Sequence, residues 1–231
     1  MEKYKQIYKE KGIVVIPDVF TPEECEKMKE EAKKTEFPQT QYMHGKRALA
    51  FMVARSNPYL NQIRTDKRLV DIVKFFIGDN VKQVNNQVYF REGGDGDQFA
   101  WHQDIVFREP RERFQGVEEG YIQTIIAVDD IEEDNGAVEF IEGSHLEGEQ
   151  EITSSSNVTK MLRKFQRRGL QGKKYTAKKG SVLLWTVLTV HGSEENTSDK
   201  DRFTYMNGFC KSENCLDYDH YLINGEVIKE I

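Results

Sequence analysis

The spacing of apolar residues changes near residue 81, and this change constrains the fold more than any other feature of the sequence. Before it, apolar residues recur at helical spacing, and the capping box Thr21-Pro22-Glu23-Glu24 predicts a helix to about Thr35. After it, short apolar stretches such as 121–128 are separated by polar turns. Helices followed by many short antiparallel strands predict a β-sandwich or jelly roll with helices packed outside it.

The other predicted elements fit one domain of residues 1–231, because no internal repeat or long linker divides the chain. Two further N-terminal helices are expected at 4–11 and 66–77. Further strands are expected at 12–17, 84–91, 137–141, 181–190 and 202–209. A short amphipathic helix is expected to be inserted between strands, since Val158, Met161, Leu162 and Phe165 recur at helical spacing and Gly169 stops the pattern.

Composition excludes several classes of protein. A formal net charge of −6 argues against general nucleic-acid binding. No apolar stretch approaches the roughly 20 residues of a membrane-spanning helix, and the charged N-terminus lacks a signal core. The three cysteines are too scattered for a disulfide framework, so a reducing cytoplasm is expected. A small-molecule partner is therefore favoured, whereas the oligomeric state cannot be read from the sequence.

Two histidines and one aspartate form the pattern that bears most on function. Alternate side chains of a strand share a face, so His102 and Asp104 are expected to point together while Gln103 points away. A second imidazole, from His191 at the end of a distant apolar strand, would complete the facial triad of mononuclear non-haem iron(II) oxygenases. Zinc accepts the same ligands, so the residues alone leave the identity of the metal open.

Other polar residues are placed to complete such a site. Arg202 lies eleven positions after His191, and its rigid, permanently charged fork suits a dicarboxylate cosubstrate. One face of the 84–91 strand is polar and is either solvated or lines a cavity; its residues are Asn85, Gln87, Tyr89 and Arg91. His145 is expected to be a turn residue bonded to the backbone. Trp185 is expected to fill the core rather than line the site.

A basic segment departs from the acidic balance of the chain. Residues 160–179 contain nine lysines and arginines and no acidic residue. Such a run is most often a solvated helix face, but it could also cover an active site and attract an anionic substrate. In the second case Lys160, Arg163, Lys164 and Arg167 would face the incoming ligand.

Three blocks of sequence resemble the phytanoyl-CoA dioxygenase-like (PhyH) family of iron(II)- and 2-oxoglutarate-dependent oxygenases. The first is Trp101-His102-Gln103-Asp104. The second runs from Ala127-Val128-Asp129-Asp130 to Gly143-Ser144-His145, and has Glu142 where the family usually has proline. The third begins at Gly180-Ser181-Val182 and includes His191-Gly192-Ser193, Asn196, Ser198 and Arg202. With the segment 12–24, the resemblance spans most of the chain.

The resemblance implies a double-stranded β-helix (jelly roll, cupin-like) core with flanking N-terminal α-helices and a helical insert. It implies iron(II), 2-oxoglutarate and dioxygen as cofactor and cosubstrates, with ascorbate as a reductant. The implied iron ligands are His102, Asp104 and His191. The implied 2-oxoglutarate-binding residues are Arg202 and Ser193 at the distal carboxylate, Asn85 or Tyr89 at the keto-acid end, and more weakly Gln123 and Ile125.

The expected reaction is hydroxylation of a small metabolite, because related halogenases have a small residue in place of Asp104; an anionic metabolite is expected if the basic segment covers the site. The segments 105–119 and 146–179 are where such folds build substrate-covering loops, and they identify no substrate. Two alternatives stay open: a cupin-like metal protein acting as hydrolase, isomerase or ligand-binding module, and an inactive scaffold. Arg202 and Ser193 argue against the first, and the complete triad argues against the second.

Overall fold

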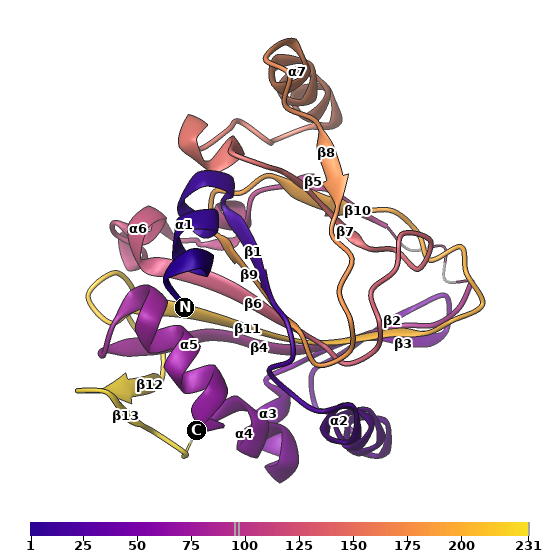
Figure 1. Ribbon diagram of the computed structural model, residues 1–231, viewed down its shortest axis with the longest axis vertical. Coiled ribbons are helices and arrows are strands. Elements are labelled where there is room, and N and C mark those ends of the chain that lie inside the picture. The colour runs from indigo at the N-terminus through magenta and orange to yellow at the C-terminus, as the bar shows by residue number, and fades with distance from the viewer. Residues whose placement is uncertain (95, 97, 231) are drawn as a thin grey trace.

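The computed structural model describes residues 1–94, 96 and 98–230 and contains two antiparallel β-sheets that face each other (Figure 1). The strands are β1 (Ile13–Ile16), β2 (Thr40–Met43), β3 (Lys46–Phe51), β4 (Val81–Arg91), β5 (Phe99–His102), β6 (Tyr121–Ala127), β7 (Val138–Ile141), β8 (Gly172–Lys174), β9 (Val182–Thr186), β10 (His191–Ser193), β11 (Arg202–Lys211), β12 (His220–Ile223) and β13 (Glu226–Val227). The larger sheet has the order β1-β9-β6-β11-β4-β12-β13, with the β2–β3 hairpin attached to β4, and the smaller has the order β5-β10-β7-β8. The sheets do not close into a barrel within the described part of the chain.

The helices lie outside the two sheets. They are α1 (Glu2–Lys11), α2 (Pro22–Lys34), α3 (Val53–Ser56), α4 (Pro58–Arg64), α5 (Lys67–Ile77), α6 (Val117–Gly120), α7 (Ser155–Arg167) and the 3-10 helices η1 (Asp104–Phe107), η2 (Arg111–Arg113) and η3 (Ser144–Glu147). The predicted capping box is present at α2, where the Thr21 hydroxyl accepts from Glu24 N and the Glu24 carboxylate accepts from Thr21 N. None of the described helices is long and apolar enough to cross a membrane.

The core of the molecule lies between the larger sheet and the N-terminal helices. Met28 of α2, Leu60 of α4 and Val73 of α5 are fully buried in one cluster with side chains of β4 and β11. Strand β11 sends Phe203, Tyr205 and Phe209 into this cluster, so its alternate residues face the other way, toward the smaller sheet. The helices thus cover the outer face of the larger sheet, and its inner face is available to line a site. The expected mainly β fold with flanking N-terminal helices and a helical insert is confirmed.

Several details differ from the sequence predictions. The strand predicted at 181–190 ends at Thr186, where the chain turns from the larger sheet into the smaller. The turn is held by a hydrogen bond from Thr189 N to Thr186 O, of 3.1 Å, and by contact between the two hydroxyls. The β2–β3 hairpin, the helices α3 and α4 and the β12–β13 hairpin were not predicted, because their apolar residues are too few to show a clear period.

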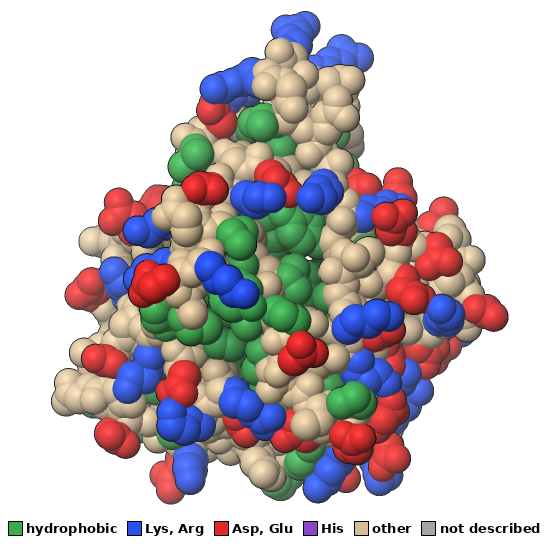
Figure 2. Space-filling view, in the orientation of Figure 1, with side chains coloured by type: hydrophobic (Ala, Val, Ile, Leu, Met, Phe, Trp, Pro, Cys, Tyr) green, Lys and Arg blue, Asp and Glu red, His purple; other side chains and the backbone are tan. Residues whose placement is uncertain are grey.

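Helix α7 is the predicted insert, and it projects from the body of the molecule at the end of the smaller sheet (Figure 1). Its expected apolar stripe is confirmed, since Met161 and Phe165 are buried against Ile141 and Val190. Lysine and arginine side chains gather at the tip of this projection (Figure 2). Its amphipathic pattern therefore correctly predicted the face that packs.

Candidate metal and cosubstrate site

A cavity of about 450 Å³ lies between the facing sheets. Strands β4, β6 and β11 form one wall, and β5, β7 and β10 form the other. All nine residues predicted for the site line it: Asn85, Tyr89, His102, Asp104, Gln123, Ile125, His191, Ser193 and Arg202. The polar face of the 84–91 strand therefore faces a cavity and not bulk solvent.

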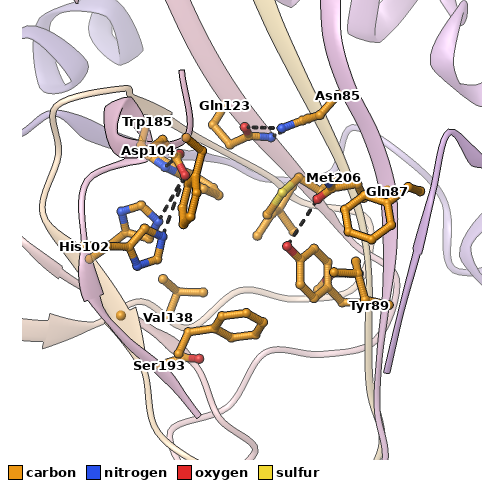
Figure 3. A pocket seen from close by; sticks show the side chains of 18 of the residues that line it. Asn85, Gln87, Tyr89, His102, Asp104, Gln123, Val138, Trp185, Ser193 and Met206 are labelled. Carbon is orange, nitrogen blue, oxygen red and sulfur yellow. Dashed lines mark hydrogen bonds and ion pairs between the residues drawn. The ribbon is translucent and has the colours of Figure 1, made fainter. Parts of the chain in front are cut away.

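The two histidines and the aspartate meet at this cavity (Figure 3). Asp104 Oδ1 lies 3.8 Å from His102 Nε2 and 3.9 Å from His191 Nε2, and the three possible ligand atoms are within 4.8 Å of one another. Ligand atoms about 2.0–2.2 Å from one metal and at right angles to each other lie roughly 3 Å apart, so small side-chain rotations bring these three atoms onto a single ion. The three side chains therefore fit one metal ion.

Backbone carbonyls orient both imidazoles. His102 Nδ1 lies 2.8 Å from Ala100 O, and His191 Nδ1 lies 2.9 Å from Thr189 O. A carbonyl can only accept, so each Nδ1 carries a proton, and Nε2 is the nitrogen of each ring that faces Asp104 and is left to ligate a metal. Burial, together with the nearby His102, lowers the pKa of His191 to about 4 and keeps that ring neutral.

Asp104 lies just beyond the strand on which it was predicted. Strand β5 ends at His102, and Asp104 begins the 3-10 helix η1. Gln103 points away as expected: it donates to Leu188 O at 2.6 Å and accepts from Gln150 N at 2.7 Å. These buried bonds fix the turn that brings Asp104 back toward the histidines.

Trp185 contacts the aspartate directly, so the expectation that it only fills the core was wrong. Its indole Nε1 donates to Asp104 Oδ2 over 2.8 Å, and the ring lines the cavity. This bond occupies one carboxylate oxygen and leaves Oδ1 facing the imidazoles. Trp185 also belongs to β9 and not to the strand of His191, because the chain changes sheets between them.

Arg202 and Ser193 offer a place for a carboxylate. Both are buried and line the cavity, Arg202 from the first position of β11 and Ser193 from the last of β10. Among the described residues, the buried Ser193 Oγ has no hydrogen-bond partner. A buried hydroxyl without a partner is costly, so a ligand oxygen there would be favoured.

The other predicted cosubstrate residues are distributed along the cavity. Tyr89 donates to Gln87 Oε1 at 3.2 Å, and burial raises the pKa of its phenol. Asn85 and Gln123 bond to each other through their amides, at 3.1 and 3.2 Å (Figure 3). These two amides are therefore engaged with one another, away from Ser193.

The sequence analysis did not identify Arg108, a second buried arginine of the cavity. Arg108 is 7% exposed and follows η1. Its Nη2 donates to the Tyr121 hydroxyl at 2.6 Å. Burial opposes its charge, yet Tyr121 and Asp104 raise the pKa of Arg108 above its ordinary value, so the cation persists. The sequence signal that could have identified Arg108 is its position four residues after Asp104, in the segment 105–119 that was expected to cover the substrate.

Two other regions lie outside the cavity lining. His145 bonds to the backbone as expected, with Nε2 3.0 Å from Lys9 O. No residue of the basic segment 160–179 lines the cavity in the described structure. Several of its cations pair with acids instead, such as Lys174 with Glu194 at 2.8 Å and Lys178 with Asp130 at 2.8 Å.

Comparisons with known proteins find relatives over most of the chain. The profile of the family described as Phytanoyl-CoA dioxygenase (PhyH) matches residues 8–204. The chain is 25% identical to a probable alpha-ketoglutarate-dependent hypophosphite dioxygenase of Stutzerimonas stutzeri, covering 94% of this chain and 84% of that protein. It is also 25% identical to an ectoine dioxygenase of Bordetella bronchiseptica, covering 75% of this chain and 60% of that protein.

Solved structures share the fold. EctD from S. alaskensis, solved with 2-oxoglutarate and 5-hydroxyectoine, superposes with a TM-score of 0.78 at 18% identity and covers 94% of this chain and 78% of that chain. The alpha-ketoglutarate-dependent epimerase SnoN superposes with a TM-score of 0.74 at 17% identity, covering 91% of this chain and 80% of that chain. The expected cupin-like jelly-roll class is confirmed by these likenesses.

Proposed function

The chain belongs to the phytanoyl-CoA dioxygenase (PhyH) family and is an iron(II)- and 2-oxoglutarate-dependent dioxygenase, and we propose that it hydroxylates a C–H bond of a small metabolite. The observation that supports this most is the convergence of His102, Asp104 and His191, with both Nδ1 atoms and Asp104 Oδ2 already bonded to the protein. Only the atoms that face each other are left to ligate a metal. Two imidazoles and one carboxylate are the donor set that suits iron(II) with open positions.

The residues divide the work of the site. His102, Asp104 and His191 would hold the iron, and Arg202 with Ser193 would hold the distal carboxylate of 2-oxoglutarate. Bound iron(II) and 2-oxoglutarate supply oxidative decarboxylation to succinate and carbon dioxide, with one oxygen atom of dioxygen entering succinate and the other the substrate. The carboxylate of Asp104 favours hydroxylation over halogenation, because it occupies the place a halide would need.

The surrounding side chains would place the substrate and exclude water. Trp185, Ile125 and Val138 line the cavity beside the ligands, and the rings of Tyr89 and Phe99 meet edge to face with centroids 5.6 Å apart. An apolar enclosure with few polar groups binds small metabolites and keeps a reactive centre dry. We propose that residues 1–231 work as one such domain, and that the cytoplasm is its compartment.

The relatives suggest which substrates to try first. Their names specify hypophosphite, a small inorganic anion, and ectoine, a small organic zwitterion. Hypophosphite would be oxidised at a P–H bond and not at a C–H bond. Both compounds belong in a first panel, together with small carboxylates and phosphonates.

The test measures iron binding and turnover separately. The protein is first loaded anaerobically with iron(II), and its metal content is determined. 2-Oxoglutarate, dioxygen and one compound of the panel are then added, and succinate release is followed. One iron per chain and substrate-stimulated succinate are expected. The matched control is His145→Ala, which removes a histidine that is not at the cavity. If His191→Ala bound iron as well as His145→Ala does, the proposed ligand set would be wrong.

A further inference from the structure

We infer that Arg108 forms an oxyanion subsite for the substrate, separate from the cosubstrate site at Arg202. The inference rests on the proposed function and extends it to the class of substrate. The ligand would carry a carboxylate or a tetrahedral phosphorus oxyanion at the end of the cavity that Arg108 occupies.

The first observation is that Arg108 is buried with part of its donor set unused. Its side chain is in the cavity lining, and its Nε has no partner among the described residues. A guanidinium carries five N–H donors in a fixed fork and matches an oxyanion with two of them. A buried N–H without an acceptor is costly, so a ligand oxygen that accepts from it would be favoured.

The second observation is a hydrogen-bond relay that fixes the guanidinium. Arg108 Nη2 donates to Tyr121 Oη at 2.6 Å, and Tyr121 Oη donates to Gln123 Oε1 at 2.7 Å. Gln123 is bonded in turn to Asn85. Two side chains of the relay pack against Gly208. A Cβ atom there would lie 2.3 Å from Tyr121 Oη and 2.7 Å from Asn85 Oδ1, which is too close for any residue but glycine. The local sequence thus makes room for these side chains and holds Arg108 in one orientation.

The third observation is the separation, along β11, of Arg202 from Gly208, the residue beside the relay that holds Arg108. Arg202 begins the strand, and Gly208, below the relay, lies six residues further along it. Six residues of extended strand span about 20 Å between Cα atoms. Figure 3 shows the Asn85–Gln123 pair at the top of the view, beside Asp104, and Ser193 at the bottom, below the histidines. One cation therefore serves each end of the cavity.

Electrostatics explain why two buried cations can coexist here. Burial opposes the charge of Arg108, but Tyr121 and then Asp104 raise its pKa. An incoming oxyanion would offset the desolvation cost of the buried guanidinium further. The two groups would form a charge-assisted hydrogen-bonded pair that water cannot screen. An apolar substrate would leave Arg108 Nε without an acceptor.

The test uses the protein loaded with iron(II) and 2-oxoglutarate in the absence of dioxygen, so that Arg202 is already engaged. Inorganic sulfate and acetate are titrated separately by calorimetry, as a tetrahedral and a planar oxyanion. We expect at least one of them to bind the parent protein. Its affinity should fall at least tenfold in Arg108→Gln, while the affinity for 2-oxoglutarate changes less than twofold.

Two further variants make the result specific. Arg111→Gln removes one positive charge from the same segment at a partly exposed position outside the cavity lining, and should change neither affinity. Tyr121→Phe keeps the charge of Arg108 but removes its relay partner, and should weaken anion binding by a smaller factor. Thermal unfolding of each variant reports whether it folds.

Each outcome separates the two proposals. The subsite is overturned if neither anion binds the parent protein, if Arg108→Gln binds it as the parent does, or if Arg108→Gln loses 2-oxoglutarate instead. If the parent protein binds neither iron nor 2-oxoglutarate, the proposed function itself fails, independently of Arg108.

Discussion

The indole of Trp185 donates to Asp104 Oδ2 over 2.8 Å, across the gap between the two sheets. The bond joins β9 of the larger sheet to the turn after β5 of the smaller one. It decides which carboxylate oxygen points at the histidines, and so it couples the packing of the sandwich to the geometry of the metal site.

The first prediction concerns this bond. Trp185→Phe keeps most of the apolar volume but removes the donor, so the Asp104 carboxylate should rotate more freely. Loss of a hydrogen bond behind a metal ligand typically costs about 10- to 100-fold in metal affinity, and that loss is expected here. Iron(II) affinity is measured by competition with a chelator. Trp101→Phe, at a tryptophan packed against Gly172, is the control and should bind iron normally.

The second prediction concerns Arg202. Lysine in its place keeps the charge but loses the planar two-pronged donor set, so 2-oxoglutarate should bind about tenfold or more weakly. Calorimetry of the iron-loaded protein measures this affinity directly. Arg64→Lys is the matched control, because Arg64 is another fully buried arginine that bonds to Gln83, away from the cavity lining. Equal 2-oxoglutarate affinities in the parent and Arg202→Lys would place the clamp elsewhere.

The third prediction is a dependence of stability on pH that comes from Arg68. This arginine bonds to Glu24 at 2.7 Å and to Asp66 at 2.8 Å, and its hydrogen bonds lower the pKa of both carboxyls. Carboxyls with lowered pKa stabilise the fold above their ordinary values of 4.5 and 3.8, and this contribution disappears as the pH falls further. The cluster is partly exposed, so about 1 kcal/mol or less is expected.

Arg68→Gln should therefore lower the free energy of unfolding near pH 7 and have little effect near pH 2. Denaturant unfolding at both pH values measures the difference. Lys67→Gln, which disrupts the exposed pair of Lys67 with Asp71 on the same helix, is the control. A loss of stability that is the same at both pH values would show that Arg68 acts by packing and not by charge.

The sequence was sufficient to predict that His102 and Asp104 converge, because their spacing reflects a local rule. His102 and Asp104 point the same way although η1 begins at Asp104, since Gln103 is held on the opposite side by buried hydrogen bonds. The cavity-facing residues of β4 and β6 also follow the alternation of a strand. Patterns of period two therefore revealed which side chains line the cavity.

What the sequence did not reveal depends on contacts between distant segments. The bond from Trp185 to Asp104 and the relay from Arg108 to Asn85 each cross between elements whose relative position is set by packing. The turn at 187–190 was read as continued strand because its residues are mostly apolar. Those apolar side chains are buried where the chain passes from one sheet to the other, so they do not mark a single continuous strand.

The last prediction concerns the basic segment 160–179. Along β5 and β10, His102 and His191 face the cavity, so their neighbours Trp101 and Val190 face the opposite side of the smaller sheet. Helix α7 packs on that opposite side, against Val190 with Trp101 at the edge of the cluster. The smaller sheet thus separates the helix from the metal ligands. The hypothesis of an anion-attracting lid accordingly finds no support in the cavity lining.

Neutralising Arg163, Lys164 and Arg167 together by glutamine should change the affinities for 2-oxoglutarate and for sulfate by less than twofold. Stability should change little, because the apolar stripe that anchors the helix is untouched. Titrations at low and at moderate salt measure both affinities, since a long-range effect of these charges would be screened by salt. Sulfate binding that weakens in the triple variant only at low salt would show that the segment steers anions from behind the sheet.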